Sequence, residues 1–463
     1  MLYINSEGSM NFRFVNIKSL TTTLAVVTTL SVTANAAGTR YKDRLFDVTT
    51  KKDVTYASDV PNLSSLHTLA QLAISAGQPI YFYANETSVT EKPMTLDLYT
   101  PKGDSEKKRA AVIVAHGGAM VAGAKDDMDQ HSVTYCDSLA ARGFVTASIE
   151  YRLGVSISGP LTNMVVDSMD FARSVYRGTQ DINAAVRYMR KNADELGIDP
   201  NKIYLLGNSS GAILSIENIY ASEEKDFPTY LNRDGIPDLG TLNLYGEQGV
   251  DHHANAGVFL WGAIHDPKII GKNKTPVFLA HGSDDGTVLF KTGRPLKNAA
   301  ALIKHLVPAD FSPALAAMNL DIQTPTLYGS FVIDSILKAN DIAHETHFLE
   351  GAGHEFYDED DLEEPLRTKI FDFLYNLASS DGSTAIKHVT LARSSGIQMQ
   401  NGNMSFTVMN GNGLKYIVTD LRGRPAKTGT VSVGESVDLS SLRSGVYVLQ
   451  VQGERAIRFG LSK

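Results

Sequence analysis

The sequence has a single cysteine, Cys136, among its 463 residues. One cysteine excludes an internal disulfide and a zinc site built from thiolates, and we expect Cys136 to be buried as a small apolar side chain. The sequence also lacks basic charge, because 43 Lys and Arg stand against 51 Asp and Glu, which gives a net charge of −8. Without a basic excess, nucleic acid is not expected as a partner.

Long apolar runs are missing as well. An uncharged, threonine-rich run at residues 20–33 is too short to span a bilayer stably. It follows two basic residues and precedes Ala34-Asn35-Ala36, which is the charged, apolar and A-x-A order of a secretory signal peptide. We therefore predict a signal peptide region at residues 1–36, with Met10 as its expected start, and we expect the protein to be exported.

Short apolar runs alternate with amphipathic stretches through most of the remaining chain. The expected strands are residues 94–99, 110–115, 144–149, 203–206, 258–261, 277–280 and 346–349. Most are continuous apolar runs, which are typical of a sheet buried on both faces. The clearest helix repeats its apolar residues at helical spacing from Ile182 to Leu196 and meets Gly197 as a stop signal. This alternation predicts an α/β domain with a mostly parallel sheet over residues 37–378.

The pattern changes near residue 380. The run Ser379-Ser380-Asp381-Gly382-Ser383 is typical of a linker, which we place at residues 379–385. Residues 386–463 show no helical period, and their β-prone runs are separated by Asn-Gly and glycine-rich turns. We predict a small C-terminal β-sandwich domain there.

The first chemical motif is Gly207-Asn208-Ser209-Ser210-Gly211, which lies between an expected strand and an apolar, helix-like stretch. A G-x-S-x-G motif in that context is typical of a nucleophile elbow, whose strained turn exposes the serine hydroxyl. The glycines remove side chains that would collide there. Ser209 is the favoured nucleophile, and Ser210 is the alternative if the frame shifts by one.

A nucleophilic serine needs a base, and the base needs an orienting carboxylate. An acid follows the strand at 277–280 and a histidine follows the strand at 346–349, in the order Ser, Asp, His that elbow enzymes use. We predict Asp285 and His354 for these roles, with Asp284 as the alternative acid. His281 is expected to brace the loop that carries the aspartate.

Other histidines and acids suggest no metal. His252 and His253 have no partners at metal-ligand spacing and are interpreted as surface loop residues. The acidic residues from Asp126 to Asp129 lack the spacing of a calcium loop. The sequence therefore predicts neither a metal nor a cofactor.

The strand at 110–115 ends in His116-Gly117-Gly118-Ala119. Such a segment offers backbone N–H groups that no side chain shields, and these can bind the negative charge of a tetrahedral intermediate. We predict an oxyanion hole made by the backbone of Gly118 or Ala119 together with the amide of Ser210. His116 is expected to hold this loop by hydrogen bonds.

Residues of about 94–375 resemble the α/β-hydrolase superfamily, in particular secreted bacterial carboxylesterases and feruloyl or acetylxylan esterases. The resemblance rests on Leu96-Asp97-Leu98-Tyr99, His116-Gly117-Gly118, Glu150-Tyr151-Arg152-Leu153-Gly154, the stretch from Asp181 to Arg190, the elbow at 207–211, the Asp285 loop and Gly351-Ala352-Gly353-His354. It implies the α/β-hydrolase fold and a Ser-His-Asp triad that cleaves carboxylic esters, with acyl groups on plant polysaccharide as one possible target.

The sequence departs from the family pattern in two places. Glu150 stands where the family usually has Asp, and residues 291–324 look inserted between the acid and the base. We expect this insertion, with the loops at 154–176 and 223–255, to shape the acyl and alcohol pockets.

The tail resembles the C-terminal sorting domain of type IX secretion. The resemblance rests on residues 416–424 and 437–448 and on Arg458 near the end. It implies export through the periplasm and outer membrane to the surface or medium, with the type IX machinery as a partner. A carbohydrate-binding β-domain is the alternative, although the tail has no tryptophan for a stacking platform.

The sequence therefore predicts a secreted serine carboxylesterase. Two alternatives remain open. One is a serine peptidase of the same fold, and the other is a catalytically inactive α/β-hydrolase that serves as a surface adhesin.

Overall fold

The computed structural model describes residues 38–63, 82–83, 89–126, 131–156, 164–231, 236–297, 320–356, 360–380, 397–400, 405–408, 413–420, 424–433, 435–452 and 457–461. The predicted signal region at 1–36, most of the linker at 379–385 and the middle of the insertion at 291–324 lie outside the described residues.

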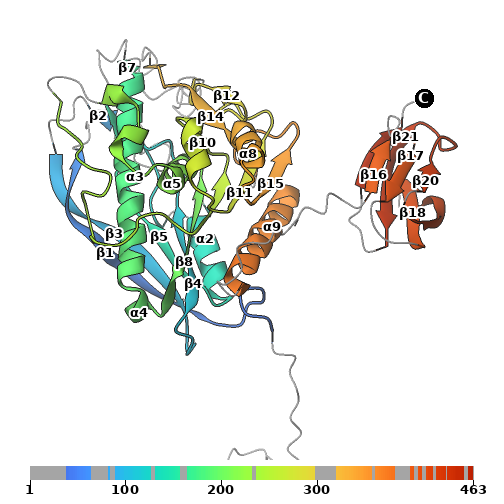
Figure 1. Ribbon diagram of the computed structural model, residues 1–463, viewed down its shortest axis with the longest axis horizontal. Coiled ribbons are helices and arrows are strands. Elements are labelled where there is room, and N and C mark those ends of the chain that lie inside the picture. The colour runs from blue at the N-terminus through green and yellow to red at the C-terminus, as the bar shows by residue number, and fades with distance from the viewer. Residues whose placement is uncertain are drawn as a thin grey trace, which may run out of the picture. The chain divides into compact units, whose positions relative to one another are not determined.

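A mixed sheet of eight strands forms the centre of the larger domain, in the order β1-β3-β5-β4-β8-β9-β11-β15 (Figure 1). The strands are β1 (Val48–Leu63), β3 (Val89–Pro101), β4 (Arg109–Ala115), β5 (Val145–Ile149), β8 (Ile198–Asn208), β9 (Ala256–Leu260), β11 (Val277–Gly282) and β15 (His344–Leu349). β1 and β3 are antiparallel to their neighbours, and all pairs from β5 to β15 are parallel. The predicted α/β class with a mostly parallel sheet is confirmed.

The two faces of the sheet pack against two separate apolar cores. In β4, every residue is buried, and alternate side chains go to opposite faces. Ala111, Ile113 and Ala115 join the core under α3 (Ser168–Lys191), α5 (Ser210–Tyr220) and α8 (Ser330–Ala339). Ala110, Val112 and Val114 join the core with α2 (Ser132–Ala140) and α9 (Asp360–Ser379). This double burial explains the continuous apolar runs of the parallel strands.

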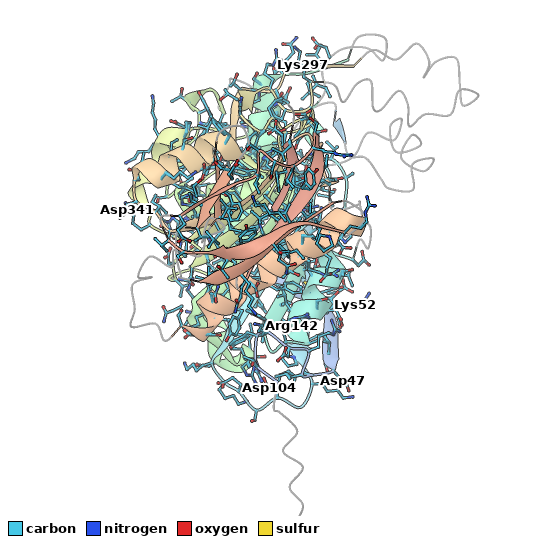
Figure 2. The ribbon with its side chains drawn as sticks, turned by 90° about the vertical axis from the view of Figure 1, so that its right-hand side faces the viewer. Asp47, Lys52, Asp104, Arg142, Lys297 and Asp341 are labelled. Atoms are coloured by element: carbon cyan, nitrogen blue, oxygen red, sulfur yellow. The ribbon has the colours of Figure 1, made fainter. Side chains whose placement is uncertain are left out.

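The long edge strand β1 was not foreseen from the sequence. It is antiparallel to β3, and its burial does not alternate: residues 49–53 are all exposed, and exposed Ser58 and Asp59 lie between buried Ala57 and Val60. Its register slips at three places, which breaks the period-two signal that marks a strand. Lys52 and Asp341 lie at the outer surface (Figure 2).

The helix predicted through Leu196 is broken. α3 ends at Lys191, and a separate turn, α4 (Ala193–Leu196), follows before Gly197 adopts φ of 64° as its C-cap. At the other end, α3 already begins at Ser168, with Asp167 capping it through a reciprocal bond to Asp170. The segment 154–176, expected to be a loop, is therefore helical in its second half.

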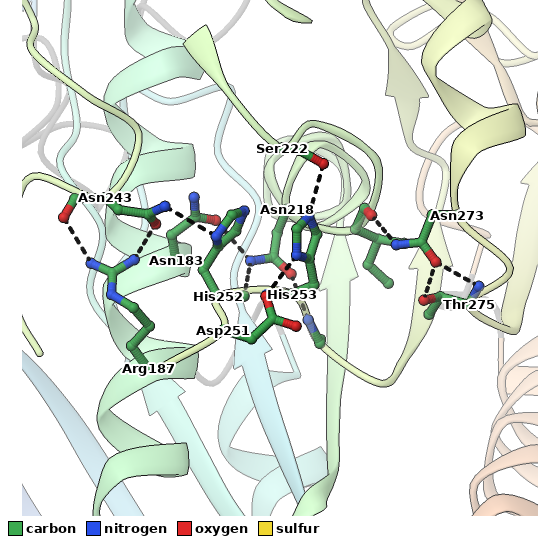
Figure 3. Close-up of polar contacts among 12 residues, drawn as sticks. Asn183, Arg187, Asn218, Ser222, Asn243, Asp251, His252, His253, Asn273 and Thr275 are labelled. Carbon is green, nitrogen blue, oxygen red and sulfur yellow. Dashed lines mark hydrogen bonds and ion pairs between the residues drawn. The ribbon is translucent and has the colours of Figure 1, made fainter. Parts of the chain in front are cut away.

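Buried arginines on α3 hold the segment that follows α5. Figure 3 shows one of them, Arg187, with its contact Asn243. Arg173 donates to the carbonyls of Leu231 and Pro237, each at 2.7 Å, and Arg187 donates to that of Glu247 at 2.6 Å. A buried guanidinium needs acceptors for its five donors. The segment 223–255, expected from the sequence to be a loop, supplies them by running along α3 with backbone carbonyls turned toward the helix.

Smaller elements complete this domain. β10 (Ala263–Ile264), β14 (Leu327–Gly329) and β12 (Thr292–Gly293) form an antiparallel sheet, β13 (Leu320–Ile322) pairs with β7 (Met164–Val166), and β2 (Phe82–Tyr83) pairs with β6 (Val155–Ser156). The 3₁₀ helices are η2 (Glu224–Asp226), η3 (Thr229–Leu231) and η4 (Pro267–Lys272). Within the described part of the chain, we find no helix long and apolar enough to cross a membrane.

The C-terminal residues form two antiparallel sheets, β16-β17-β20 and β19-β18-β21-β22. These strands are β16 (Ile397–Gln400), β17 (Ser405–Val408), β18 (Leu414–Asp420), β19 (Pro425–Val431), β20 (Ser436–Asp438), β21 (Gly445–Val451) and β22 (Ile457–Leu461). Both sheets contribute to one apolar core, which includes Phe406, Val418 and Leu449. The arrangement fits the predicted β-sandwich, and the domain boundaries stay a prediction.

We predict that a chain ending at Ser380 folds as the full protein does. The two cores around the large sheet draw on residues up to Ala378, and the tail core draws on residues from Ile397 onward. Because Lys202 donates to the carbonyls of Ala378 and Ser380, the cut falls after that contact. Calorimetry on residues 39–380 is expected to reproduce the main unfolding transition. A broad transition, with loss of the near-ultraviolet circular dichroism, contradicts the division.

Candidate active site

Ser209 occupies a strained turn between β8, which ends at Asn208, and α5, which begins at Ser210. Its φ of 50° and ψ of −119° place a non-glycine residue in a region that L residues rarely adopt. A Cβ at Gly207 would lie 2.4 Å from the Gly211 carbonyl oxygen, and one at Gly211 would lie 2.2 Å from that of Ala115. Both glycines are therefore required by close approach of the backbone.

Three side chains from three different loops form one chain of hydrogen bonds. His354 Nε2 lies 3.0 Å from Ser209 Oγ, and His354 Nδ1 lies 2.7 Å from Asp285 Oδ2. The three loops follow β8, β11 and β15, whose carboxyl ends meet at the same edge of the parallel sheet. The structure thus brings together the three residues singled out from the sequence. Ser210, the alternative serine, instead has its hydroxyl 3.1 Å from that of Tyr151.

The Asp285 carboxylate is buried and fully engaged. Its Oδ1 accepts from the backbone N–H groups of Thr287 and Val288, at 2.8 and 2.9 Å. Its Oδ2 accepts from His354 and also from His281 Nε2, at 3.1 Å. Burial by itself raises the pKa of Asp285, but the hydrogen bonds and charges of the two histidines outweigh it and hold the pKa well below its ordinary value.

The alternative acid, Asp284, has other partners. It is exposed, its backbone N–H donates to the Ala352 carbonyl, and its Oδ1 accepts from the Ser283 hydroxyl at 2.9 Å. That hydroxyl in turn accepts from the Gly351 N–H. Asp284 therefore links the loop after β11 to the loop that carries His354.

The segment after β4 makes a tight turn next to the elbow. Gly118, Ala119 and Met120 have positive φ values of 105°, 55° and 58°, and the N–H groups of Val121 and Ala122 both donate to the Gly118 carbonyl. A Cβ on Gly118 would lie 2.1 Å from the Ala122 carbonyl oxygen, so only glycine fits. Ser210 opens α5, where backbone N–H groups carry the positive end of the helix dipole.

Tyr151 joins this turn to the elbow, and the sequence did not single it out as a site residue. Its hydroxyl lies 3.0 and 3.1 Å from the carbonyl oxygens of His116 and Gly117, besides its contact with Ser210. The signal was present, because Tyr151 belongs to the Glu-Tyr-Arg motif after β5, but the motif says nothing of what its hydroxyl touches. Its ring stacks on His116 at 4.3 Å.

His116 is fully buried, and Nδ1 donates to its neighbour's carbonyl at Gly117, at 2.7 Å. Burial lowers the pKa of His116 to about 4, so its ring is neutral near pH 7. From the sequence, we expect His116 to hold the loop after β4 by hydrogen bonds, and its bond to Gly117 lies within that loop.

Two further residues border His354 and were not selected from the sequence. The Trp261 ring lies 6.1 Å from the His354 ring and 5.1 Å from that of Phe356. Trp261 is fully buried and follows β9 with φ of 44°. Glu355 places Oε1 3.8 Å from His354 Nε2.

The interpretation of His252 and His253 as surface residues is wrong for His252. His252 is only 6% exposed, and burial lowers its pKa to about 4. Asp251, His252 and His253 hold side-chain atoms within 4.8 Å of one another (Figure 3). These atoms already have protein partners: His253 Nδ1 pairs with Asp251 at 2.7 Å, and Asn243 Nδ2 donates to His252 Nδ1 at 3.1 Å. Arg190 also donates to carbonyls of this segment, and its positive charge opposes a cation. We assign no metal here.

The sequence is similar over part of its length to a protein family and to curated esterases. The family model described as BD-FAE matches residues 96–234. Mouse carboxylesterase 3B is 32% identical over 131 residues, covering 27% of this chain and 20% of the mouse protein. A probable isoprenylcysteine alpha-carbonyl methylesterase of Oryza sativa is 25% identical over 242 residues, covering 46% of this chain and 53% of its own length. The chain thus spans about half or less of these two relatives.

Among solved structures, Thermogutta terrifontis esterase 2 phosphonylated by cyclosarin is 18% identical, with a TM-score of 0.39, and the match covers 66% of this chain and 97% of that protein. The fold is defined by this chain's own sheet, in which two antiparallel strands, β1 and β3, precede six parallel strands. It does not rest on the similarity to that structure. The chain has the fold of the α/β-hydrolase superfamily, and the two relatives that it matches in part are a carboxylesterase and a probable methylesterase.

Proposed function

We propose that the protein is a serine carboxylic-ester hydrolase that works through an acyl-enzyme. The observation that carries this proposal is the continuous chain of hydrogen bonds from Ser209 through His354 to Asp285, with the serine on a strained turn. A serine is a weak nucleophile until a positioned base removes its proton. This arrangement supplies the base and the carboxylate that orients it.

The proposed reaction has two halves. Ser209 Oγ attacks the ester carbonyl while His354 Nε2 takes the hydroxyl proton and then delivers it to the departing alcohol. A water molecule, activated by the same nitrogen, then releases the acid. Asp285 remains ionised throughout, because its low pKa keeps it a carboxylate, and it stabilises the imidazolium that forms in each half.

The oxyanion hole is assigned to backbone N–H groups. We place donors at Gly118 or Ala119, in the turn after β4, and at Ser210, at the start of α5. Tyr151 supports this assignment, since one hydroxyl contacts both segments. Removing one such donor typically costs about 2.7–4 kcal/mol of transition-state stabilisation.

Substrate and location extend the proposal. Acyl esters on plant polysaccharide are the proposed substrates, supported by the resemblance to feruloyl and acetylxylan esterases. Export through the periplasm and outer membrane to the surface or medium is supported by the signal pattern at 1–36 and by the tail motifs at 416–424 and 437–448. The type IX secretion machinery is the proposed partner of the C-terminal domain.

A substrate panel tests the reaction class. Purified protein is assayed on p-nitrophenyl acyl esters, acetylated xylan, methyl ferulate and casein. Ester cleavage without casein cleavage is expected. Casein cleavage at a comparable rate would support a peptidase, and absence of both turnover and fluorophosphonate labelling would support an adhesin.

We predict that Ser209→Ala abolishes ester cleavage while leaving the fold intact. Removing the nucleophile of such a unit typically lowers turnover by a factor on the order of 10⁶. The melting temperature is expected to stay the same or rise slightly, since strain at the turn can relax. Turnover of p-nitrophenyl acetate and thermal melting are the measurements.

Ser210→Ala is the matched control. Its proposed role uses only the backbone N–H, so the loss of its hydroxyl contact with Tyr151 is expected to cost less than about tenfold, the equivalent of one ordinary hydrogen bond. An inactive Ser210→Ala beside an active Ser209→Ala contradicts the assignment of the nucleophile.

We predict that Asp285→Asn lowers turnover by a factor on the order of 10⁴, because an amide favours the wrong tautomer of His354. Its effect on stability depends on pH. The folded-state pKa of Asp285 lies below the unfolded value, so the carboxylate contributes stability that is present above about pH 4 and is lost as the pH falls through the folded pKa.

Melting temperatures of the wild type and Asp285→Asn measure this dependence. The wild type is expected to be more stable near neutral pH, and the difference is expected to shrink below about pH 4. A difference that is constant or that grows on acidification contradicts the low pKa.

A further inference from the structure

The carboxylate of Asp285 serves two histidines through one oxygen. Oδ2 lies 2.7 Å from His354 Nδ1 and 3.1 Å from His281 Nε2. His281 lies on β11, four residues before Asp285, and both side chains are completely buried. The second histidine is therefore fixed against the acid of the proposed triad, where water does not screen their interaction.

The partners of His281 determine where its proton lies. Nε2 also lies 2.8 Å from the Val288 carbonyl oxygen, and neither a carbonyl nor an ionised carboxylate can donate. Nε2 must therefore carry the hydrogen. Nδ1 lies 2.8 Å from the buried hydroxyl of Ser330, the first residue of α8, which is able to donate or accept. His281 thus presents an N–H to Asp285 in either protonation state.

Two donors on one carboxylate oxygen share its negative charge. Each hydrogen bond stabilises the carboxylate and thereby weakens the attraction that the carboxylate exerts on the other donor. We propose that His281 is a positioning residue that acts through Asp285, orienting its carboxylate and lowering the basicity of His354. This inference rests on the proposed function, because it concerns the same three residues.

The benefit for the proposed reaction is a base in the correct state. A general base must be unprotonated before the reaction, and an ionised carboxylate that faced the imidazole alone would attract its proton more strongly. The donor from His281 weakens that attraction while keeping Asp285 ionised. The hydrogen-bond partners of His281 are Asp285, Val288 and Ser330, so it acts on Ser209 and His354 only through Asp285.

Other titratable groups surround the site and are left unchanged by the test. Glu355 Oε1 lies 3.8 Å from His354 Nε2, and Asp284 is exposed next to Asp285. On β15, His347 contacts Lys369 Nζ, and its ring lies 6.1 Å from that of Phe356. Because these groups stay the same in every variant, a change in pH dependence is due to His281.

The test compares His281→Phe, which keeps a ring but removes the donor, with His281→Gln, whose amide nitrogen can replace Nε2–H. The pH profile of kcat/KM on p-nitrophenyl acetate reports the ionisation of the free enzyme's base. In His281→Phe, the acid limb is expected to move upward by roughly half to one pH unit, the size of one lost hydrogen bond. In His281→Gln, the acid limb is expected to lie close to its wild-type position, because the amide donor replaces Nε2–H.

The matched control is His344→Gln. His344 lies on β15 and contacts Asp334 and the Ile342 carbonyl, away from the hydrogen-bonded triad. The acid limb of the kcat/KM profile of His344→Gln is expected to coincide with that of the wild type. A downward shift in His281→Phe, or a loss of activity with an unmoved limb in both His281 variants, would overturn the proposal and leave His281 as a brace of the loop.

A measurement on the unmutated protein covers the case in which His281→Phe does not fold. The Nε2–H resonance of His281 is followed by nuclear magnetic resonance while His354 is titrated. A shift with the midpoint of His354 is expected, and an unmoved resonance overturns the proposal. This result does not depend on catalysis, so if Ser209→Ala kept full activity, the proposed function would fail while the coupling of the two histidines would still be decided.

Discussion

The close approach of α5 to the end of β4 is the constraint on which the rest of the site depends. Gly211 meets the Ala115 carbonyl where a Cβ would stand 2.2 Å away, and this contact forces the chain to turn sharply at Ser209. The unfavourable backbone conformation of Ser209 persists because the buried strands β4 and β8 and the helix hold both sides of the turn. Stability of the parallel sheet is thus used to maintain strain at a single residue.

The same edge of the sheet supplies every other part of the proposed site. Loops that follow parallel strands leave at one edge, so residues far apart in the chain meet there. His354 lies 145 positions from Ser209 and 69 from Asp285, yet its two ring nitrogens contact both. Strand ends place these side chains, while hydrogen bonds between the loops, such as that from the Gly351 N–H to Ser283 Oγ, fix how they face one another.

Two sets of buried polar groups in this protein have different roles, one structural and one in the proposed active site. On α3, arginines bind backbone carbonyls of the segment that covers the helix, which satisfies their charge-bearing donors and anchors a long irregular stretch. At the site, Asp285 receives four donors, and burial cannot then neutralise it. The arginines hold a covering segment against the core, and the four donors keep Asp285 ionised beside His354.

The sequence by itself determined the elements whose signals are local. The G-x-S-x-G motif records the close contacts of its two glycines, continuous apolar runs record strands buried on both faces, and the order of Ser209, Asp285 and His354 follows strand ends. Tertiary structure alone decided which side chains share a partner. The contacts of Tyr151, the burial of His252 and the irregular edge strand β1 all depend on segments remote in sequence. The second donor of Asp285 lies only four residues away, but it shares its carboxylate oxygen with His354, which comes from a distant loop. A linear pattern records periodicity and turn strain, and it carries no trace of a contact made across the fold.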